Sequence, residues 1–305
     1  MATFIARRMT QSIVMLLALM VIVFALVRAT GSPVDLYLPQ DASAEMRAEL
    51  TERLGLDRPL LEQFAAWTGD VVRLDFGTSL WQHRPAMEMV AEALPHSLAL
   101  GAITLSLAFL AAVIVGSMAA LRPHGLFDGI AGTLSLAGAS IPDFWFALMG
   151  VLVFAVTLEW LPTSGFGGPA YWVLPVLTLV LRPFGVLVQV VRGAMIATLS
   201  SPYIRAARAK GALERRVLFG HALRNALLPV VTVTGDLAAQ FAGGVTVVET
   251  VFGWPGIGKL MIDAILQRDF AVLQAGVLVV AAVIILINMA VDLLYVAIDP
   301  RVRLA

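Results

Sequence analysis

Long apolar runs without charge dominate the pattern of this chain. Four of them contain no Asp, Glu, Lys or Arg: Met9–Val27, Ala93–Leu121, Trp160–Leu181 and Phe270–Val291. Two more, Gly129–Leu158 and Asn225–Val248, reach a similar length with one acid each, Asp143 and Asp236. About 20 helical residues, rising about 1.5 Å each, cross the hydrocarbon core of a bilayer. The pattern therefore predicts an all-α membrane protein with six transmembrane helices.

The composition supports a membrane protein and excludes several other classes. Of the 305 residues, 59% are apolar and 14% are charged, which leaves too few polar side chains to cover a water-soluble enzyme. The 21 basic and 21 acidic residues balance, which argues against binding of nucleic acid. With no cysteine, disulfides and thiol chemistry are excluded. The four histidines lack metal-ligand spacing on one helix, and no Ser-His-Asp triad is plausible, so we expect neither a metal site nor a catalytic site.

The distribution of basic residues predicts the orientation of the chain. The connection between the fourth and fifth runs carries one acid, Glu214, and seven basic residues: Arg192, Arg205, Arg208, Lys210, Arg215, Arg216 and Arg224. Because short basic loops stay in the cytoplasm, this connection is predicted to be cytoplasmic, together with both termini. The segment Glu159–Ala170, without Lys or Arg, falls on the opposite side. Arg7 and Arg8 precede the first run, which we interpret as a retained anchor.

The chain therefore divides into three predicted parts. Residues 1–28 form an N-terminal segment with the first transmembrane helix, residues 29–92 an extracytoplasmic segment, and residues 93–305 the core transmembrane domain, with a cytoplasmic loop at 192–228. In the outer segment, Ser43 is a candidate N-cap for a helix that begins at Ala44 and stops at Gly55. A second helix opening at Pro59 places four apolar residues on one face: Leu60, Phe64, Trp67 and Val71. This face packs either against the protein's own spans or against a soluble partner.

The cytoplasmic loop contains two predicted helices. Ser201-Pro202 is a helix start, with the hydroxyl as N-cap and proline at the first helical position. The first helix, Tyr203–Lys210, ends at Gly211, and the second covers Glu214–Asn225. Two short helices separated by glycine are typical of a docking platform. The alternative is an amphipathic helix whose arginines lie on anionic membrane lipid.

At this loop the sequence resembles a known family. The stretches Tyr203-Ile-Arg-Ala-Ala-Arg-Ala-Lys-Gly211 and His221-Ala-Leu-Arg-Asn-Ala-Leu-Leu-Pro229 resemble the EAA loop of permease subunits in bacterial ATP-binding cassette importers. In that family a short cytoplasmic helix seats in a groove of the ATPase subunit. The resemblance implies that coupling to the ATPase involves Tyr203, Arg205, Ala206, Ala207, Arg208, Lys210 and Gly211. Arg205 departs from the wider pattern, which has Glu at this position.

Further stretches resemble the B-type subunit of the dipeptide and oligopeptide branch. These stretches are Leu54–Leu60, Asp75–Ser79, Ser140–Trp145, Val248–Gly258, Asn288–Tyr295 and Asp299–Arg301. The resemblance implies a homologous second permease subunit, two ATPase subunits or a fused pair, and an extracytoplasmic substrate-binding protein, in the bacterial inner (plasma) membrane. ATP and Mg are expected on the partner subunits, with no cofactor on this chain. The implied substrate is a peptide, and the same subunit type also resembles carriers of glutathione and of nickel complexes.

Charged groups inside the bilayer are costly and need partners or water. From the helical rise we expect Arg182 to pair with Asp236 or Asp292, with Asn288 one turn from Asp292. Asp143 follows Pro142, which bends the third span, and is the candidate lining residue of a polar translocation path. The alternative for Asp143 is a hydrogen bond to a neighbouring helix.

Two other classes of function compete with a permease subunit. A membrane-embedded enzyme would need a catalytic constellation within the spans, and the sequence offers none. A standalone secondary transporter would use Asp143 and Asp292 as ligands of a coupling ion. An ATPase that copurifies with the chain in mild detergent would distinguish a permease subunit from both.

Overall fold

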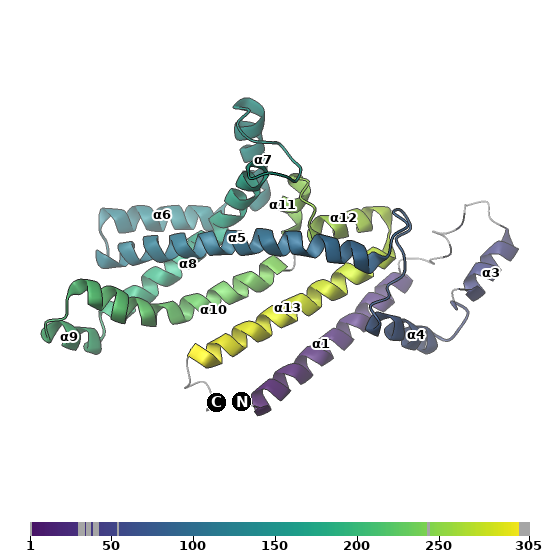
Figure 1. Cartoon of the computed structure of the whole chain (residues 1–305), viewed down its shortest axis with the longest axis horizontal. Helices are drawn as coiled ribbons and strands as arrows, with labels where there is room; N and C mark the ends of the chain where they lie inside the picture. The colour runs from purple at the N-terminus through teal and green to yellow at the C-terminus, as the bar shows by residue number, and fades with distance from the viewer. Residues whose placement is uncertain are drawn as a thin grey trace. The chain divides into compact units, whose positions relative to one another are not determined.

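The computed structural model describes residues 2–29, 34, 38, 43–53, 55–242 and 245–298. These residues are helical apart from their connections and one isolated bridge between Thr78 and Pro85 (Figure 1). Asp299–Arg301, Leu54 and the tail residue Arg303 lie outside the described residues. The chain forms two compact units. One contains Met1–Leu94 and Leu260–Val283, and the other contains Pro95–Lys259 and Ile284–Ala305.

Five helical segments are long and apolar enough to cross a membrane. They are α1 (Ala2–Ala29), α5 (Ala86–Leu121), α8 (Ala170–Leu199), the π-helical turn η2 (Arg216–Ala222) continued by α10 (Leu223–Ala242), and α13 (Phe270–Ile298). Lipid contact suits α1 in particular, since apolar side chains such as Met15 are exposed. These five segments correspond to five of the six predicted spans.

The third predicted span is a broken helix. Its two halves, α6 (Leu126–Ser140) and α7 (Asp143–Gly150) continued by η1 (Val151–Thr157), meet at an angle of 96°. The cause is local, because the residue before a proline is driven out of the α region. Ile141 is extended, with φ −73° and ψ 128°, and Pro142 is extended as well. The bend predicted at Pro142 is thus present and makes Asp143 the first residue of α7.

Three predicted boundaries are wrong. The fourth span begins at Ala170 and not at Trp160, because the turn-forming residues between them, which include Gly165 with φ +113°, interrupt the helix. It then runs to Leu199, so Arg192 lies inside α8 and not in the cytoplasmic loop. The fifth span ends at Ala242, and Thr246–Val251 forms a separate helix, α11.

In the first unit, the outer segment packs on α1. The helix α3 (Ala44–Arg53) begins as predicted, with the Met46 backbone N–H 3.2 Å from the Ser43 hydroxyl. The helix α4 (Leu60–Val72) places Phe64 and Trp67 against Phe24 of α1, at ring-centroid distances of 5.3 and 5.7 Å. The apolar face of α4 therefore contacts the protein's own helix, the first of the two predicted alternatives, while Leu60 stays exposed.

Residues 75–85 are held to the turn between α12 (Ile257–Gln267) and α13. The Ser79 hydroxyl donates to the buried Asp269 carboxylate at 2.5 Å, and the Trp81 indole donates to the Gln267 carbonyl at 2.7 Å. The Trp67 indole donates to the Gln274 side chain at 2.8 Å. These bonds join segments 186 to 207 residues apart in sequence, so they hold distant parts of the chain together in the first unit.

In the second unit, α6 packs closely against α8. A Cβ at Gly138 would lie 3.2 Å from the Leu181 carbonyl oxygen, and a Cβ at Gly185 would overlap the Ser135 carbonyl oxygen. Glycine at these positions lets the two backbones approach, as small residues do between membrane helices. On the other side of α8, Val191 leaves no room for a side chain at Gly116 of α5. The described core therefore has α8 at its centre.

We expect Gly185→Ala to separate α6 from α8. The added methyl group has no space, and overpacking of this kind costs about 1–3 kcal/mol. Gly193→Ala is the matched control, because it lies in the same helix with no atom within 4 Å of the added group. Thermal unfolding of the purified protein in detergent checks this prediction: Gly185→Ala should lower the midpoint and Gly193→Ala should not. Equal midpoints for the two variants would contradict the close approach.

Candidate functional site

The predicted docking platform is a short helix between α8 and α10. This helix, α9, covers Pro202–Ala209, with Pro202 at the first helical position as predicted (Figure 1). The predicted N-cap bond is wrong, because the Ser201 hydroxyl donates to the Thr198 carbonyl at 2.6 Å and not to the start of α9. Gly211 has φ +78°, which suits glycine and ends the helix where predicted.

One side of α9 contacts other helices of the second unit. Ile204 is fully buried in the apolar core that also contains Val217 and Ala222 of η2. The Asn225 amide donates to the Tyr203 hydroxyl at 2.7 Å. One apolar contact and one hydrogen bond therefore hold α9 in a fixed orientation on the membrane helices.

The opposite side of α9 presents basic groups. Arg205, Ala206, Arg208 and Lys210 are exposed, and Ala207 is half-buried. Arg208 forms a two-pronged contact with Glu214, at 2.7 and 3.2 Å. This contact lowers the pKa of the Glu214 carboxyl, because the guanidinium stabilises its charged form. The pair therefore remains charged at neutral pH, and both residues face solvent, where such pairs add little stability.

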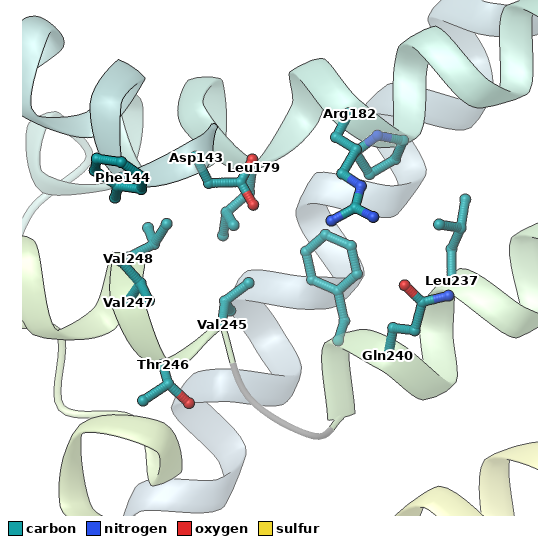
Figure 2. A pocket seen from close by; sticks show the side chains of 12 residues that line it. Asp143, Phe144, Leu179, Arg182, Leu237, Gln240, Val245, Thr246, Val247 and Val248 are labelled. Atoms are coloured by element: carbon teal, nitrogen blue, oxygen red, sulfur yellow. The ribbon is translucent and has the colours of Figure 1, made fainter. Parts of the chain in front are cut away.

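A pocket of about 360 Å³ lies further along α8. Asp143 of α7 and Arg182 of α8 point into it, and Gln240 of α10 lies across from Arg182, as Figure 2 shows. The other lining residues are apolar except for Thr246: Phe144, Leu179, Pro183, Leu237, Phe241, Val245, Val247 and Val248. The pocket thus contains one acidic and one basic side chain within an otherwise neutral lining.

The structure distributes the predicted intramembrane residues differently from the expected cluster. Arg182 shares the pocket with Asp143, whereas Asp236 is exposed on α10 and Asn288 is exposed on α13. Within the described residues, no hydrogen bond or ion pair connects Arg182 to Asp236. The helical rise gives only positions along each helix, and it contains no information on which side of one helix faces another.

Sequence reasoning missed an ion pair near the predicted cytoplasmic end of α8. Arg192 binds the Asp128 carboxylate through Nε and through Nη2, the latter at 2.8 Å, and the His124 backbone N–H donates to the same carboxylate at 2.8 Å. Asp128 is buried, so the pair fixes the start of α6 to α8. The one-turn spacing between Arg192 and Gln189, which reaches the Gly132 carbonyl, shows that one side of α8 supplies these contacts.

A second missed feature is the buried carboxyl group of Glu249. It is fully buried in α11 and accepts hydrogen bonds from the Ser97 hydroxyl at 2.5 Å and from the Lys259 backbone N–H at 3.1 Å. The Ser97 hydroxyl in turn accepts from the Ile257 backbone N–H at 2.8 Å. Burial without such partners would be strongly unfavourable.

The glycines that follow Glu249 make room for it. A Cβ at Gly256 would overlap the Glu249 carboxyl, and a Cβ at Gly258 would lie 2.8 Å from its Oε2. Trp254 is also fully buried, and its indole donates to the His96 carbonyl at 3.2 Å. The segment Val248–Gly258 is thereby tied to α5, and it positions the pocket wall formed by the residues just before Glu249.

The described part of the chain contains no group of three or more His, Cys, Asp or Glu side chains arranged to hold a metal ion. Its two distinctive surfaces are a basic helix anchored at one end of α8 and a pocket with opposed charges along the same helix. The described residues thus form a helical fold with several helices long and apolar enough to cross a membrane, as expected of a membrane component of a transport system. The chain belongs to the family of binding-protein-dependent transport system inner membrane components, whose sequence model matches residues 112–304, while the model of the N-terminal part matches residues 1–101.

Curated relatives align along the whole chain. The oligopeptide transport system permease protein AppB of Bacillus subtilis is 38% identical, covering 99% of this chain and 100% of its own. The di/tripeptide transport system permease protein DppB of Pseudomonas aeruginosa is 36% identical, covering 99% of each chain. The predicted resemblance to importer permeases of the dipeptide and oligopeptide branch is confirmed.

Solved structures share the fold. A chain of the MetNI methionine ABC transporter, solved in inward-facing conformations, has a TM-score of 0.59 at 16% identity, covering 70% of this chain and 97% of that chain. A chain from an amino acid ABC transporter solved with histidines has a TM-score of 0.51 at 14% identity, covering 70% and 94%. The inner-membrane location follows from the family, and these structures share the helical fold.

We expect replacement of Glu249 to loosen the segment Val248–Gly258. Glu249→Ala leaves the Ser97 hydroxyl and the Lys259 N–H without their acceptor, which costs about 1–3 kcal/mol for each buried group. Glu249→Gln keeps the shape but turns one acceptor into a donor, so it should also destabilise. The control is Glu62→Gln, an exposed carboxylate of α4. Thermal unfolding in detergent measures the effect, and a midpoint unchanged in both Glu249 variants would contradict the role of this carboxyl group.

Proposed function

We propose that this chain is the permease subunit of an ATP-driven importer of dipeptides or oligopeptides. The observation that supports this most is the full-length similarity to curated permeases whose names specify oligopeptides and di/tripeptides. The coarser role, an inner membrane component of a binding-protein-dependent transport system, follows from family membership. The chain itself forms half of the translocation path.

The proposed partners are those that such an importer needs. A homologous permease subunit supplies the other half of the path, and two ATPase subunits, or a fused pair, bind ATP and Mg on the cytoplasmic side. An extracytoplasmic substrate-binding protein delivers the peptide to the outer segment, residues 29–92. The exposed apolar residues of the membrane-crossing helices contact lipid or the second permease.

We assign coupling to α9 and its surroundings. The anchored side, with Tyr203 and Ile204, transmits force to the membrane helices, because a buried side chain cannot slide without disturbing its neighbours. The exposed side contacts the ATPase through Arg205, Ala206, Ala207, Arg208, Lys210 and Gly211. Contact with the ATPase places α9 on the cytoplasmic side of the membrane, and both termini of the chain then lie on that side as well. ATP hydrolysis on the partners then produces a rigid-body movement that switches the access of the central path.

We assign the path to the second unit, where Asp143 and Arg182 line the pocket in Figure 2. Asp236 and Asn288 are further candidates on the exposed faces of α10 and α13, and Asp292 lies one turn beyond Asn288. In the complete importer these faces lie opposite the second permease. Polar groups in such positions require water or a polar ligand, as a translocation path provides.

Reconstitution tests the proposed function. The complex of both permeases and the ATPases, placed in liposomes with the binding protein outside and ATP inside, should accumulate a labelled dipeptide. Accumulation should require ATP and the binding protein. Uptake by this chain alone would favour a secondary transporter, and uptake of glutathione or a nickel complex but no peptide would overturn the substrate assignment.

We expect charge reversal on α9 to uncouple the importer. Arg205→Glu combined with Lys210→Glu reverses two exposed charges without breaking the Arg208–Glu214 contact. Peptide uptake should fall at least about tenfold, the effect of losing one charge-assisted contact. Uptake and ATP hydrolysis are measured in the same liposomes.

The matched control is Arg122→Glu, which reverses an exposed charge between α5 and α6, outside both α9 and the outer segment. Membrane insertion of all variants is checked by extraction and immunoblotting. Normal uptake in the α9 double variant would rule out its exposed face as the ATPase contact.

A further inference from the structure

The charges of Asp143 and Arg182 remain open to the pocket. No hydrogen bond or ion pair among the described residues uses either charged group, and none joins the two groups to each other. This differs from Asp128 and Arg192 on the same two-helix framework, which bind each other directly. The two charges attract each other only at a distance, and without a direct contact they favour a ligand that brings the opposite charge to each.

The two groups lie on different walls of the pocket. Asp143 belongs to the first turn of α7, and Arg182 belongs to the interior of α8, so their side chains enter the pocket from separate elements (Figure 2). A ligand with a positive end and a negative end can therefore contact both at once. An anion alone would leave Asp143 unmatched, and a cation alone would leave Arg182 unmatched.

The lining between the charges suits the middle of such a ligand. Leu179, Leu237 and Phe241 offer apolar contact, and the Gln240 amide offers one donor group and one acceptor group. A peptide bond, which also has one donor and one acceptor, complements an amide side chain. The arrangement follows the general rule that small-molecule pockets are mostly apolar with a few polar groups that fix orientation.

The size of the pocket limits the length of the ligand. Its volume of about 360 Å³ is near the lower end for small-molecule sites, which range over about 300–1,000 Å³. Each added residue lengthens an extended peptide by about 3.3–3.6 Å, so both ends of a long peptide cannot lie in one pocket of this size.

We propose that Asp143 and Arg182 form a subsite for a small zwitterion of dipeptide size, with the ammonium group of the ligand at Asp143 and its carboxylate at Arg182. The subsite rests on the proposed function and adds to it a selection step inside the permease itself. It gives the membrane subunit a preference for peptides with both termini free.

Equilibrium binding to the assembled complex tests the subsite. The complex of both permeases and the ATPases is placed in lipid nanodiscs without the binding protein, and three labelled probes are titrated: dialanine, N-acetyl-dialanine and dialanine amide. The native complex should bind dialanine at least about tenfold more tightly than either blocked form, the effect expected of one charge-assisted contact. Equal affinity for all three, or no binding of dialanine, would overturn the proposal without any variant.

Variants then assign each charge to one end of the ligand. Asp143→Asn should weaken dialanine and its amide about tenfold and leave N-acetyl-dialanine unchanged, because the acetylated probe has no ammonium group to lose. Arg182→Gln should weaken dialanine and its N-acetyl form and leave the amide unchanged. Equal weakening of all three probes by each variant would indicate a structural role and refute the assignment.

Two controls keep the result specific. Glu159→Gln and Arg122→Gln make matched acid-to-amide and arginine-to-glutamine changes at exposed positions outside the pocket and should leave all three affinities unchanged. Stoichiometric copurification with the partner subunits confirms that each variant assembles. ATP-dependent dipeptide uptake in liposomes with the binding protein distinguishes failure of the subsite from failure of the proposed function. If the complex takes up dipeptide but binds all three probes equally, the subsite alone is refuted. If it takes up no peptide at all, the proposed function is refuted.

Discussion

A charged or polar group buried away from water is costly unless it has hydrogen-bond partners within the protein. Glu249 shows the consequence most clearly. Its carboxyl group is fully buried and holds Ser97 of α5 and the backbone at Lys259 together. The two glycines after it are required because any side chain there would occupy the space of the carboxyl group. One buried acid thus fixes the path of the chain from α11 into α12.

The charged side chains of the second unit fall into two groups: those that pair with each other and hold two helices together, and those that face a pocket. Asp128 and Arg192 satisfy each other, so they fix α6 on α8 and are not available to a ligand. Asp143 and Arg182 lie on the same framework and face a pocket instead. Because breaking a buried pair is costly, the first pair behaves as a permanent joint. The open charges can change partners as a ligand or water enters.

The sequence predicted features that depend on a short stretch of chain. The number of apolar runs, the bend at Pro142, the cap at Ser43 and the stop at Gly211 each follow from residues within a few positions of one another. The apolar face of α4 was also visible, although its partner Phe24 was not. Hydrophobic periodicity and turn-forming residues determine such local features.

What the sequence did not reveal depends on how distant helices face each other. Arg182 was assigned partners from its depth alone, and the structure places it beside Asp143 because the rotation of α8 directs it to the pocket. The Ser201 hydroxyl was expected to cap α9 but bonds back to Thr198, an alternative that the same local pattern allows. Glu249 and Ser97 are 152 residues apart, and nothing in either neighbourhood indicates the other.

The position of α8 connects the two candidate surfaces mechanically. Its 30 residues span roughly 45 Å, with the lining residue Arg182 near the middle and α9 directly after its end. The close contact at Gly185 and the Asp128–Arg192 pair make α6 move with α8. The opposite pocket wall, α11, is held by Glu249 to α5, and its Val248 packs in one apolar core with Leu179 of α8. On the proposed coupling, a displacement of α9 is therefore transmitted through α8 to both walls of the pocket.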